Sequence, residues 1–379
     1  MLEPDTLRLI WWLLIAVLFA LFAVTDGFDF GALILLPWVT ARDEQRRVVL
    51  NAVGATWEGN QTWLITAIGA TFAAWPMVYA ASFSVMYPAM MLALFALFAR
   101  PVGFDYRSKL PGRGWRAAWD CALFAGGFIP TFTFGLLVGN LFVGLPFTVD
   151  RVFRITATTS FTGLFHPFAI LVAAAAVALF TMHGGAYVQK RAEAPFARVI
   201  GRFTTGAALV FMLLFVACGI WVTRSLPGLQ NQAATLLQAP AAGASSSTEL
   251  VAGGWAGNFE RVPALLALPL LAVACAVQTA LLTGRGRWQI AFCTSALTVL
   301  SAVGTAAVAL FPVLLLSSSD PASSLTVWNS SSSPHTLQIM LFVAALFVPL
   351  IMLYTAFVYR VLRGPVTVQH VRDQGTKAY

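Results

Sequence analysis

The stretch RLIWWLLIAVLFALFAVTDGFDFGALILLP, residues 8–37, decides the class of fold of this chain. Beyond its first residue, its only ionisable side chains are those of Asp26 and Asp29. About 20 apolar residues are enough for a helix to cross the hydrocarbon of a bilayer. The stretch therefore predicts a membrane-spanning helix, which Gly27, Gly31 and the two aspartates could bend, tilt or break.

The composition extends this prediction to the whole chain. Hydrophobic residues make up 59% of the sequence and charged residues only 10%, whereas a soluble domain carries roughly 25% charged residues. The apolar residues come in long blocks and not in the short alternating segments of a membrane β-barrel. We therefore expect an all-α, polytopic transmembrane helix bundle that forms a single integral-membrane domain over residues 1–379.

The apolar blocks predict about nine spans, or eight if the second and third merge at Trp75-Pro76. The net charge of +8 comes from Lys and Arg in short connectors, where they set topology and do not indicate nucleic-acid binding. Alternate connectors are rich in these residues, which predicts an outside N-terminus and a cytoplasmic C-terminus. The expected spans cover residues 8–37, 57–75, 78–99, 119–141, 163–187, 203–224, 262–283, 289–316 and 337–360.

Asp26 and Asp29 are the first candidates for function, because an ionisable side chain within a membrane span usually faces a bundle interior or a polar cavity. Their spacing puts both carboxylates on one face of a helix. They could line a polar pocket or a proton path. The alternative is that they lie at the membrane boundary and are solvated.

The segment WEGNQTW, residues 57–63, opens the second predicted span and supplies Glu58. Helical spacing places Glu58 on one face with Gln61 and Thr62. A buried carboxyl beside amides and hydroxyls could take up and release protons near neutral pH. Alternatively, Glu58 stabilises the positive end of its own helix. Trp63 is typical either of an interface belt or of packing within the bundle.

The segment RPVGFDYRSK, residues 100–109, mixes charges at a predicted cytoplasmic helix end. Asp105 and Lys109 have the spacing and order that favour an ion pair along a helix. The segment is either the entrance of a proton route or a solvated boundary.

The sequence offers little for binding a metal. The four cysteines lie in apolar blocks without CxxC spacing, so we expect no metal site in this chain. A haem needs an axial ligand that faces an apolar cavity, and His183 is the only candidate inside a predicted span, because His166 precedes a proline at a span's outer end. A single axial His183 stays open, but no pair of histidines at similar depth is present. If this chain works in a haem enzyme, another subunit should hold the haems.

Several of these motifs, in this order, resemble the second subunit of cytochrome bd-type ubiquinol oxidases. The resemblance extends along the chain and is densest up to about residue 150. It rests on TDGFDFG (25–31), WEGNQTW (57–63), AAWPMVY (73–79), RPVGFDYRSK (100–109), GN (139–140), VGLPF (143–147), SLTVW (324–328) and PLIMLYTA (349–356).

The resemblance implies a respiratory complex of the bacterial inner membrane that oxidises ubiquinol and reduces O2 to water. Its first subunit would hold two b-type haems and one d-type haem. The resemblance also allows further partners, namely small accessory membrane subunits, quinol and lipid. This chain would support that subunit and contribute routes for protons and oxygen, with no catalytic residue of its own. No nucleic acid is involved.

Carried over residue by residue, the resemblance makes Glu58 the first candidate for a proton relay. Asp26, Asp29, Asp105 and Lys109 would extend the same polar route, and Trp63 would lie near an apolar oxygen entrance. Asn329 departs from relatives that have Asp after the tryptophan at 328, which argues against an acid role there.

Two other functions stay open at this point. Buried carboxylates and broken helices also occur in proton-coupled secondary transporters. A subunit of purely structural function, without conduits, would fit the same composition. A haem-containing complex would be coloured and would consume O2 with quinol, whereas a carrier would do neither.

Overall fold

A computed structural model describes residues 2–39, 42–150, 152–157, 161–229 and 250–374, except for the side chains of His370 and Gln374. Three features of the sequence lie at least partly outside these residues: Arg151, which is an exception to the alternation of charged connectors, Lys377 of the C-terminal tail, and most of the Ala- and Ser-rich connector at 227–258.

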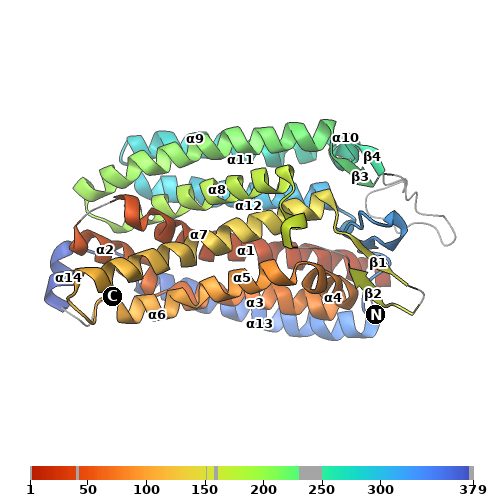
Figure 1. The fold of residues 1–379 in the computed structure, drawn as a ribbon, viewed down its shortest axis with the longest axis horizontal. Coiled ribbons are helices and arrows are strands. Elements are labelled where there is room, and N and C mark those ends of the chain that lie inside the picture. The colour runs from red at the N-terminus through yellow and green to blue at the C-terminus, as the bar shows by residue number, and fades with distance from the viewer. Residues whose placement is uncertain (1, 40–41, 151, 158–160, 230–249, 375–379) are drawn as a thin grey trace.

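The chain folds into an elongated bundle whose long helices run side by side (Figure 1). The helices are α1 (Pro4–Val39), α2 (Asp43–Gly54), α3 (Trp57–Ala74), α4 (Pro76–Val85), α5 (Tyr87–Leu97), α6 (Ala99–Tyr106), α7 (Arg113–Val143), α8 (Pro167–Arg191), α9 (Ala194–Arg224), α10 (Gly257–Arg261), α11 (Ala267–Gly284), α12 (Trp288–Leu310), α13 (Pro334–Val361) and α14 (Val368–Gln374). Three short antiparallel pairs join β1 (Phe147–Val149) to β2 (Ile155–Ala157), β3 (Pro227–Leu229) to β4 (Leu250–Ala252), and β5 (Val313–Leu315) to β6 (Leu325–Thr326).

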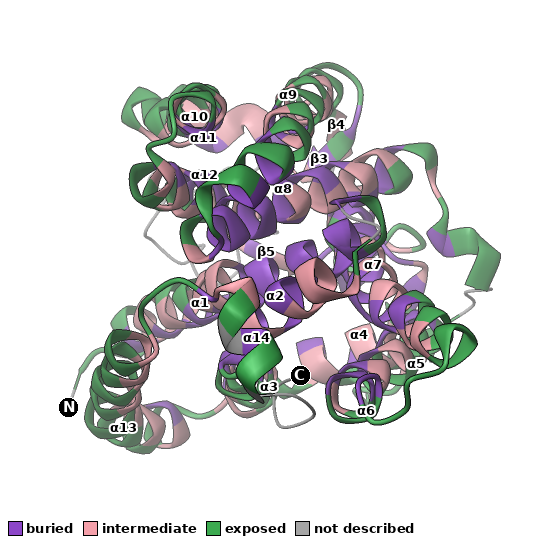
Figure 2. Ribbon diagram, turned by 90° about the vertical axis from the view of Figure 1, so that its left-hand side faces the viewer, coloured by how far each residue is buried: buried purple, intermediate pink, exposed green. Residues whose placement is uncertain are grey.

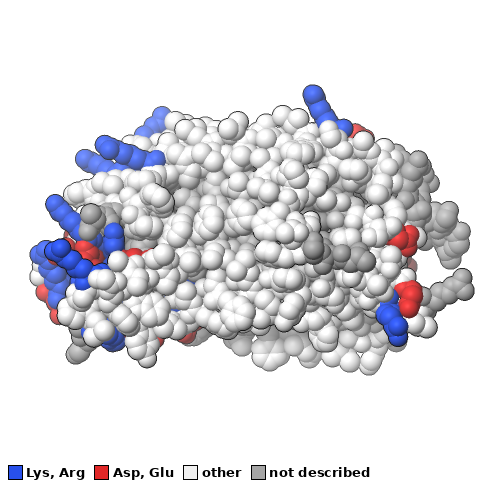
Figure 3. Space-filling model, in the orientation of Figure 1, with Lys and Arg blue, Asp and Glu red and all other residues white. Residues whose placement is uncertain are grey.

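The chain termini lie at opposite ends of the bundle (Figure 1). The short strands and α4 lie at the end that holds the N-terminus, and α2, α6 and α14 lie at the other end. Lys and Arg gather at the end with α2, α6 and α14, whereas the opposite end shows few charges of either sign (Figure 3). A long uncharged belt separates the two ends, as expected for a protein that crosses a bilayer.

The number of spans agrees with the predicted range. Among the described residues, eight helices are long and apolar enough to cross a membrane, and a ninth span results if α3 and α4 count as one bent crossing. The chain bends by 119° between α3 and α4, where Pro76 starts a new helix and cannot continue the hydrogen bonding of α3.

Two details of the predicted spans are wrong. The third span was expected at 78–99, but the long helix there runs over Tyr87–Tyr106 and α4 lies before it. The span expected at 289–316 ends at Leu310 because the chain turns into β5 at Pro312. The first span is not broken, since α1 is one continuous helix of 36 residues.

Helices α1 and α8 form the centre of the bundle and touch at their glycines. A Cβ atom on Gly31 would collide with the carbonyl oxygen of Phe180, and one on Gly184 would collide with the backbone of Gly31. Small residues at such positions let two helix backbones approach closely within a membrane. Gly27 and Gly31 thus turn one face of α1 towards α8, and Asp26 and Asp29 lie on another face.

Helix α13 lies at the edge of the bundle. Leu337 is its only buried residue, and most of its length is exposed in the end view (Figure 2). It packs mainly against α1 and α3. Its apolar outer side therefore faces either lipid or another protein.

Candidate functional site

A cluster of polar side chains lies inside the bundle, where four helices bring it together. Asp26 and Asp29 come from α1, Asn60 from α3, Arg100 from α6 and Tyr359 from α13. We call these five residues the buried charged cluster. Asp26, Asp29 and Arg100 are completely buried, and Asn60 is 1% exposed. The solvated-boundary alternative for the two aspartates is therefore wrong.

Arg100 binds Asp26 through both terminal nitrogens of its guanidinium group. Its Nη1 lies 3.0 Å from Asp26 Oδ2, and its Nη2 lies 2.5 Å from Asp26 Oδ1. The guanidinium also lies 4.6 Å from the ring centre of Phe30 and 5.4 Å from that of Trp57. Paired hydrogen bonds and aromatic faces together compensate for removing this charge from water.

Asp29 is held less completely than Asp26. Its Oδ2 accepts a hydrogen bond of 2.7 Å from Asn60 Nδ2 and lies 3.8 Å from Arg100 Nη2. Its other oxygen, Oδ1, is buried and has no hydrogen-bond partner in the described part of the chain. Asn60 Oδ1 in turn accepts a hydrogen bond of 2.6 Å from the hydroxyl of Tyr359.

The charges of this cluster do not balance. With both acids ionised, Asp26 and Asp29 carry two negative charges, and Arg100 supplies one positive charge. An uncompensated charge in a dry interior is costly, and a proton can remove that cost. Because Asp26 takes both arms of the guanidinium, Asp29 is the acid with the less complete counter-charge.

Three expected members of the proton route lie elsewhere. Glu58, Asp105 and Lys109 are exposed on the isolated chain, so the expectation that Glu58 is buried among polar groups of this chain is wrong. It occupies the first turn of α3, which keeps its alternative interaction with the helix dipole open. Asp105 and Lys109 do not pair, because α6 ends at Tyr106 before the helix reaches Lys109.

Trp63 lies inside the bundle and does not belong to an interface belt. It is 3% exposed and packs in an apolar group with Leu18, Phe22 and Leu97. The alternative of bundle packing is therefore confirmed for its position.

A second group of charges, the helix-end network, ties α2 and α7 to the turn after α6. It consists of Asp43, Arg46, Arg107, Arg116 and Asp120. Arg107 Nε lies 2.5 Å from Asp120 Oδ1, and Arg46 Nη1 lies 2.6 Å from Asp120 Oδ2. Asp43 bridges two arginines: its Oδ1 lies 3.0 Å from Arg107 Nη2, and its Oδ2 lies 2.9 Å from Arg116 Nη1.

Burial by itself lowers the pKa of the Arg107 guanidinium, but its hydrogen bonds and attraction to Asp120, together with Asp43, reverse this effect. The pKa of Arg107 therefore lies above its ordinary value, and its positive charge persists. The network therefore holds the ends of these helices together.

Sequence reasoning did not single out Arg100, Asn60, Tyr359, Arg107 or Asp120. Arg100 and Arg107 lie in the quoted segment 100–109, where the more polar-looking Asp105 and Lys109 drew attention. An arginine placed inside a span needs a buried carboxylate, but Arg100 lies just beyond the third span predicted at 78–99, so this rule did not single it out. Tyr359 carries no comparable signal in the sequence.

Both ring nitrogens of His183 are engaged in hydrogen bonds within the bundle. Its Nδ1 lies 2.8 Å from Ser295 Oγ, and its Nε2 lies 2.8 Å from the carbonyl oxygen of Val24. A carbonyl oxygen only accepts, so Nε2 must carry a proton. His183 instead joins α8 to α1 and α12 and stacks against Phe292. His166 caps α8 by accepting a hydrogen bond from the amide of Phe168.

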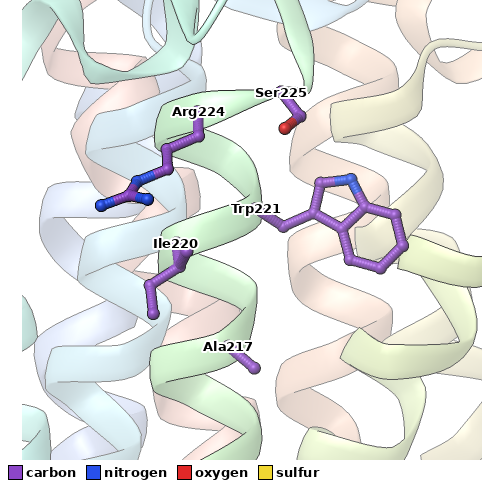
Figure 4. Close-up of a pocket in the computed structure, with 5 residues that line it drawn as sticks. All are labelled: Ala217, Ile220, Trp221, Arg224 and Ser225. Atoms are coloured by element: carbon purple, nitrogen blue, oxygen red, sulfur yellow. The ribbon is translucent and has the colours of Figure 1, made fainter.

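No group of three or more potential metal ligands occurs in the described residues. A shallow groove lies at the outer surface of α9, lined by Ala217, Ile220, Trp221, Arg224 and Ser225 (Figure 4). None of the candidate residues lines this groove. The buried charged cluster is therefore the candidate site.

The fold and this site define a class of protein, namely a multi-span helical membrane protein with an unbalanced buried charge cluster. Its family follows from comparison with known proteins. The family of cytochrome bd terminal oxidase subunit II matches residues 7–362. The chain belongs to this family.

Individual relatives agree with this assignment. The chain is 40% identical over 381 residues to cytochrome bd-I ubiquinol oxidase subunit 2 of Escherichia coli K12, with 100% of both chains covered. A probable cytochrome oxidase subunit 2 of Haemophilus influenzae is also 40% identical, with 96% of each covered. A chain of the bd oxidase of Geobacillus thermodenitrificans shares the fold with a TM-score of 0.62 at 14% identity, over 94% of this chain and 99% of that one.

The family resemblance deduced from the sequence motifs is thus confirmed. The chain is a subunit of an oxidoreductase complex and a multi-pass protein of a bacterial inner membrane. The alternative of a proton-coupled secondary transporter is not supported by these relatives.

Proposed function

We propose that this chain pairs with subunit I in a complex that oxidises ubiquinol and reduces O2 to water in the respiratory chain. The observation that carries this proposal is the family match over residues 7–362, together with 40% identity to a ubiquinol oxidase subunit 2 over the full length. The chain supports the reaction without containing its catalytic residues.

The b-type and d-type haems belong to subunit I in this proposal. They supply the electron transfer and the oxygen reduction. The engagement of both ring nitrogens of His183 supports this division, because no ring nitrogen of that residue is left to bind iron.

The end of the bundle that holds α2, α6 and α14 faces the cytoplasm. Its concentration of Lys and Arg supports this orientation (Figure 3). The N-terminus then lies outside, and the two termini lie on opposite sides of the membrane, as an odd number of crossings requires.

Asp29 is the proton-carrying acid of the buried charged cluster. Asp26 and Arg100 balance each other through two hydrogen bonds, so protonation of Asp29 switches the cluster between net charges of zero and minus one. A carboxyl with one unpartnered oxygen can also exchange its proton with water that enters the bundle. Asp26 keeps Arg100 in place and does not itself need to change charge.

Glu58 connects this cluster to the partner subunit. It is exposed on α3, only two residues from Asn60, and an ionisable side chain at this depth is not stable against lipid. The neighbouring hydroxyls of Thr62 and Thr66 already donate to carbonyls of their own helix. Glu58 is therefore the group on this face that needs a polar partner.

We assign the face formed by α3 and α13 to the contact with subunit I. The two helices are neighbours at one side of the bundle (Figure 1), and α13 has almost no buried residue of its own. Large apolar residues such as Ile65 and Phe342 are 66% and 76% exposed. Glu58 would lie inside the assembled interface and could pass protons across it.

Asp105 and Lys109 belong to the cytoplasmic entrance of this route. Both are exposed at the charged end of the bundle, where water can supply protons. Trp63 belongs to the oxygen side. Its apolar surroundings among Leu18, Phe22 and Leu97 suit O2, which partitions into hydrocarbon.

Photo-crosslinking tests the assigned face. A benzophenone side chain at position 65 on α3 should crosslink to subunit I in native membranes. The same group at position 213, which is 71% exposed on α9 at the opposite side of the bundle, should not. Crosslinking from position 213 and not from 65 would contradict the assignment.

An optical spectrum of the purified complex tests whether the haems belong to subunit I and not to this chain. The complex that copurifies with this chain should show b- and d-type haem bands and should consume O2 with ubiquinol. The isolated chain should bind no haem. Stoichiometric haem on the isolated chain would contradict the proposal.

A further inference from the structure

The side-chain amide of Asn60 lies between the carboxyl of Asp29 and the hydroxyl of Tyr359. Which of these two groups faces the amide nitrogen and which faces the amide oxygen determines the hydrogen bonds that each can make. Asn60 Nδ2 donates to Asp29 Oδ2 at 2.7 Å, and Asn60 Oδ1 accepts from Tyr359 at 2.6 Å. An ionised carboxylate can only accept hydrogen bonds, whereas a protonated carboxyl can also donate one. The present amide direction therefore suits ionised Asp29, and the reversed direction would suit protonated Asp29.

The hydroxyl of Tyr359 favours the first of these directions, because a phenol donates a hydrogen bond more strongly than it accepts one. When it donates to Oδ1, the amide nitrogen must point to Asp29. Reversal would place two oxygens against each other unless Asp29 carries a proton. Tyr359 thus stabilises ionised Asp29 indirectly, through the orientation of the Asn60 amide.

The remaining charged and titratable groups that act on Asp29 can be named. Among the described residues, they are Asp26 on its own helix, Arg100 from α6, Tyr187 from α8 and Tyr359 from α13. Helix α3 contributes only the neutral Asn60 to this set. Of the groups on neighbouring helices, Tyr359 is the one that acts through the orientation of the amide.

From this geometry we infer that Tyr359 is a positioning residue for the proton chemistry of the complex, acting on Asp29 through Asn60. This inference rests on the proposed role of Asp29. It also gives the peripheral helix α13, which has a single buried residue, a direct polar link to the buried acid.

Tyr359→Phe tests the inference with little disturbance of packing. The ring of Tyr359 meets Phe28 edge-on with centroids 6.3 Å apart, and phenylalanine retains that contact. Tyr79→Phe is the matched control, since Tyr79 packs through its ring against Phe83 on α4 at 4.3 Å and lies outside the cluster.

The readout is the infrared carbonyl band of protonated Asp29 in the purified complex, recorded from pH 5 to 9 and identified by its loss in Asp29→Asn. In Tyr359→Phe, the midpoint of its titration should move to higher pH by on the order of 1 unit, which corresponds to one lost hydrogen bond. Tyr79→Phe should leave the curve unchanged. In an Asn60→Ala background, Tyr359→Phe should produce no further shift.

Three outcomes are distinguishable. Coinciding curves for wild type and Tyr359→Phe would overturn the inference. A shift that persists in the Asn60→Ala background would overturn the part played by the amide. Absence of any Asp29 band in the wild type would instead overturn the proposed role of Asp29 itself.

Discussion

The buried charged cluster and the helix-end network are both built from Asp and Arg, yet they differ in charge balance and in surroundings. The cluster combines two aspartates with one arginine, all completely buried. The network combines two aspartates with three arginines, and the side chains of Arg46 and Arg116 are 25% and 32% exposed. The cluster therefore contains one acid without a full counter-charge, whereas every acid of the network has at least one arginine partner.

This difference separates two functions of ion pairs in one membrane protein. An excess of arginine at a helix end gives every carboxylate a positive partner and holds α2, α7 and the end of α6 together. An excess of carboxylate in a dry bundle leaves Asp29 with a charge that a proton can cancel. Geometry and stoichiometry, more than residue type, decide which carboxylate has a full counter-charge and which does not.

Loss of Arg100 should have the largest effect. Arg100→Met keeps the length of the side chain but leaves Asp26 and Asp29 buried without a positive charge, and breaking a buried pair costs about 3–5 kcal/mol. We expect little assembled complex in membranes, measured by immunoblot of both subunits. Arg100→Met together with Asp26→Leu should recover part of the assembly, and failure of any recovery would argue against the charge balance described above.

Asp120→Asn should have an intermediate effect on stability and none on turnover per complex. The change weakens hydrogen bonds to Arg107 and Arg46 at a partly hydrated helix end, for which about 1–3 kcal/mol is expected. Thermal inactivation of the purified complex should occur at a lower temperature. A large fall in turnover of the fully assembled complex would mean that the network does more than hold helix ends.

Glu58→Gln should have the smallest effect of the three. It preserves shape and removes the titratable group at the proposed contact with subunit I. We expect about a threefold loss of quinol-driven O2 consumption, well below the effect typical of a positioned general acid or base, because water at an interface can replace part of a relay. Haem content should stay complete, and unchanged turnover would remove Glu58 from the proton route.

The sequence predicted the class of fold and the family, because both depend on long apolar blocks and local motifs. It also predicted that Asp26 and Asp29 share a helix face, since helical spacing alone determines this. The partners of these acids come from segments far along the chain, at Asn60, Arg100 and Tyr359. No local pattern could bring those residues together.

The errors have physical causes as well. Glu58 was expected inside because its side chain is ionisable, but helix α3 turns Asn60 inward and Glu58 outward. The ion pair between Asp105 and Lys109 assumed a helix that continues beyond Tyr106. The third span was misplaced because apolar residues continue through α4, which bends away from α3 at Pro76.

The most direct measurement of the central claim is the turnover of Asp29→Asn in the purified complex, normalised to haem content. Asparagine can still accept the hydrogen bond of Asn60, and the variant leaves Asp26 and Arg100 as a balanced pair. The account predicts complete haem bands and O2 consumption reduced by about tenfold or more, as expected when a positioned proton-transfer group is lost. Wild-type turnover with complete haem would contradict it.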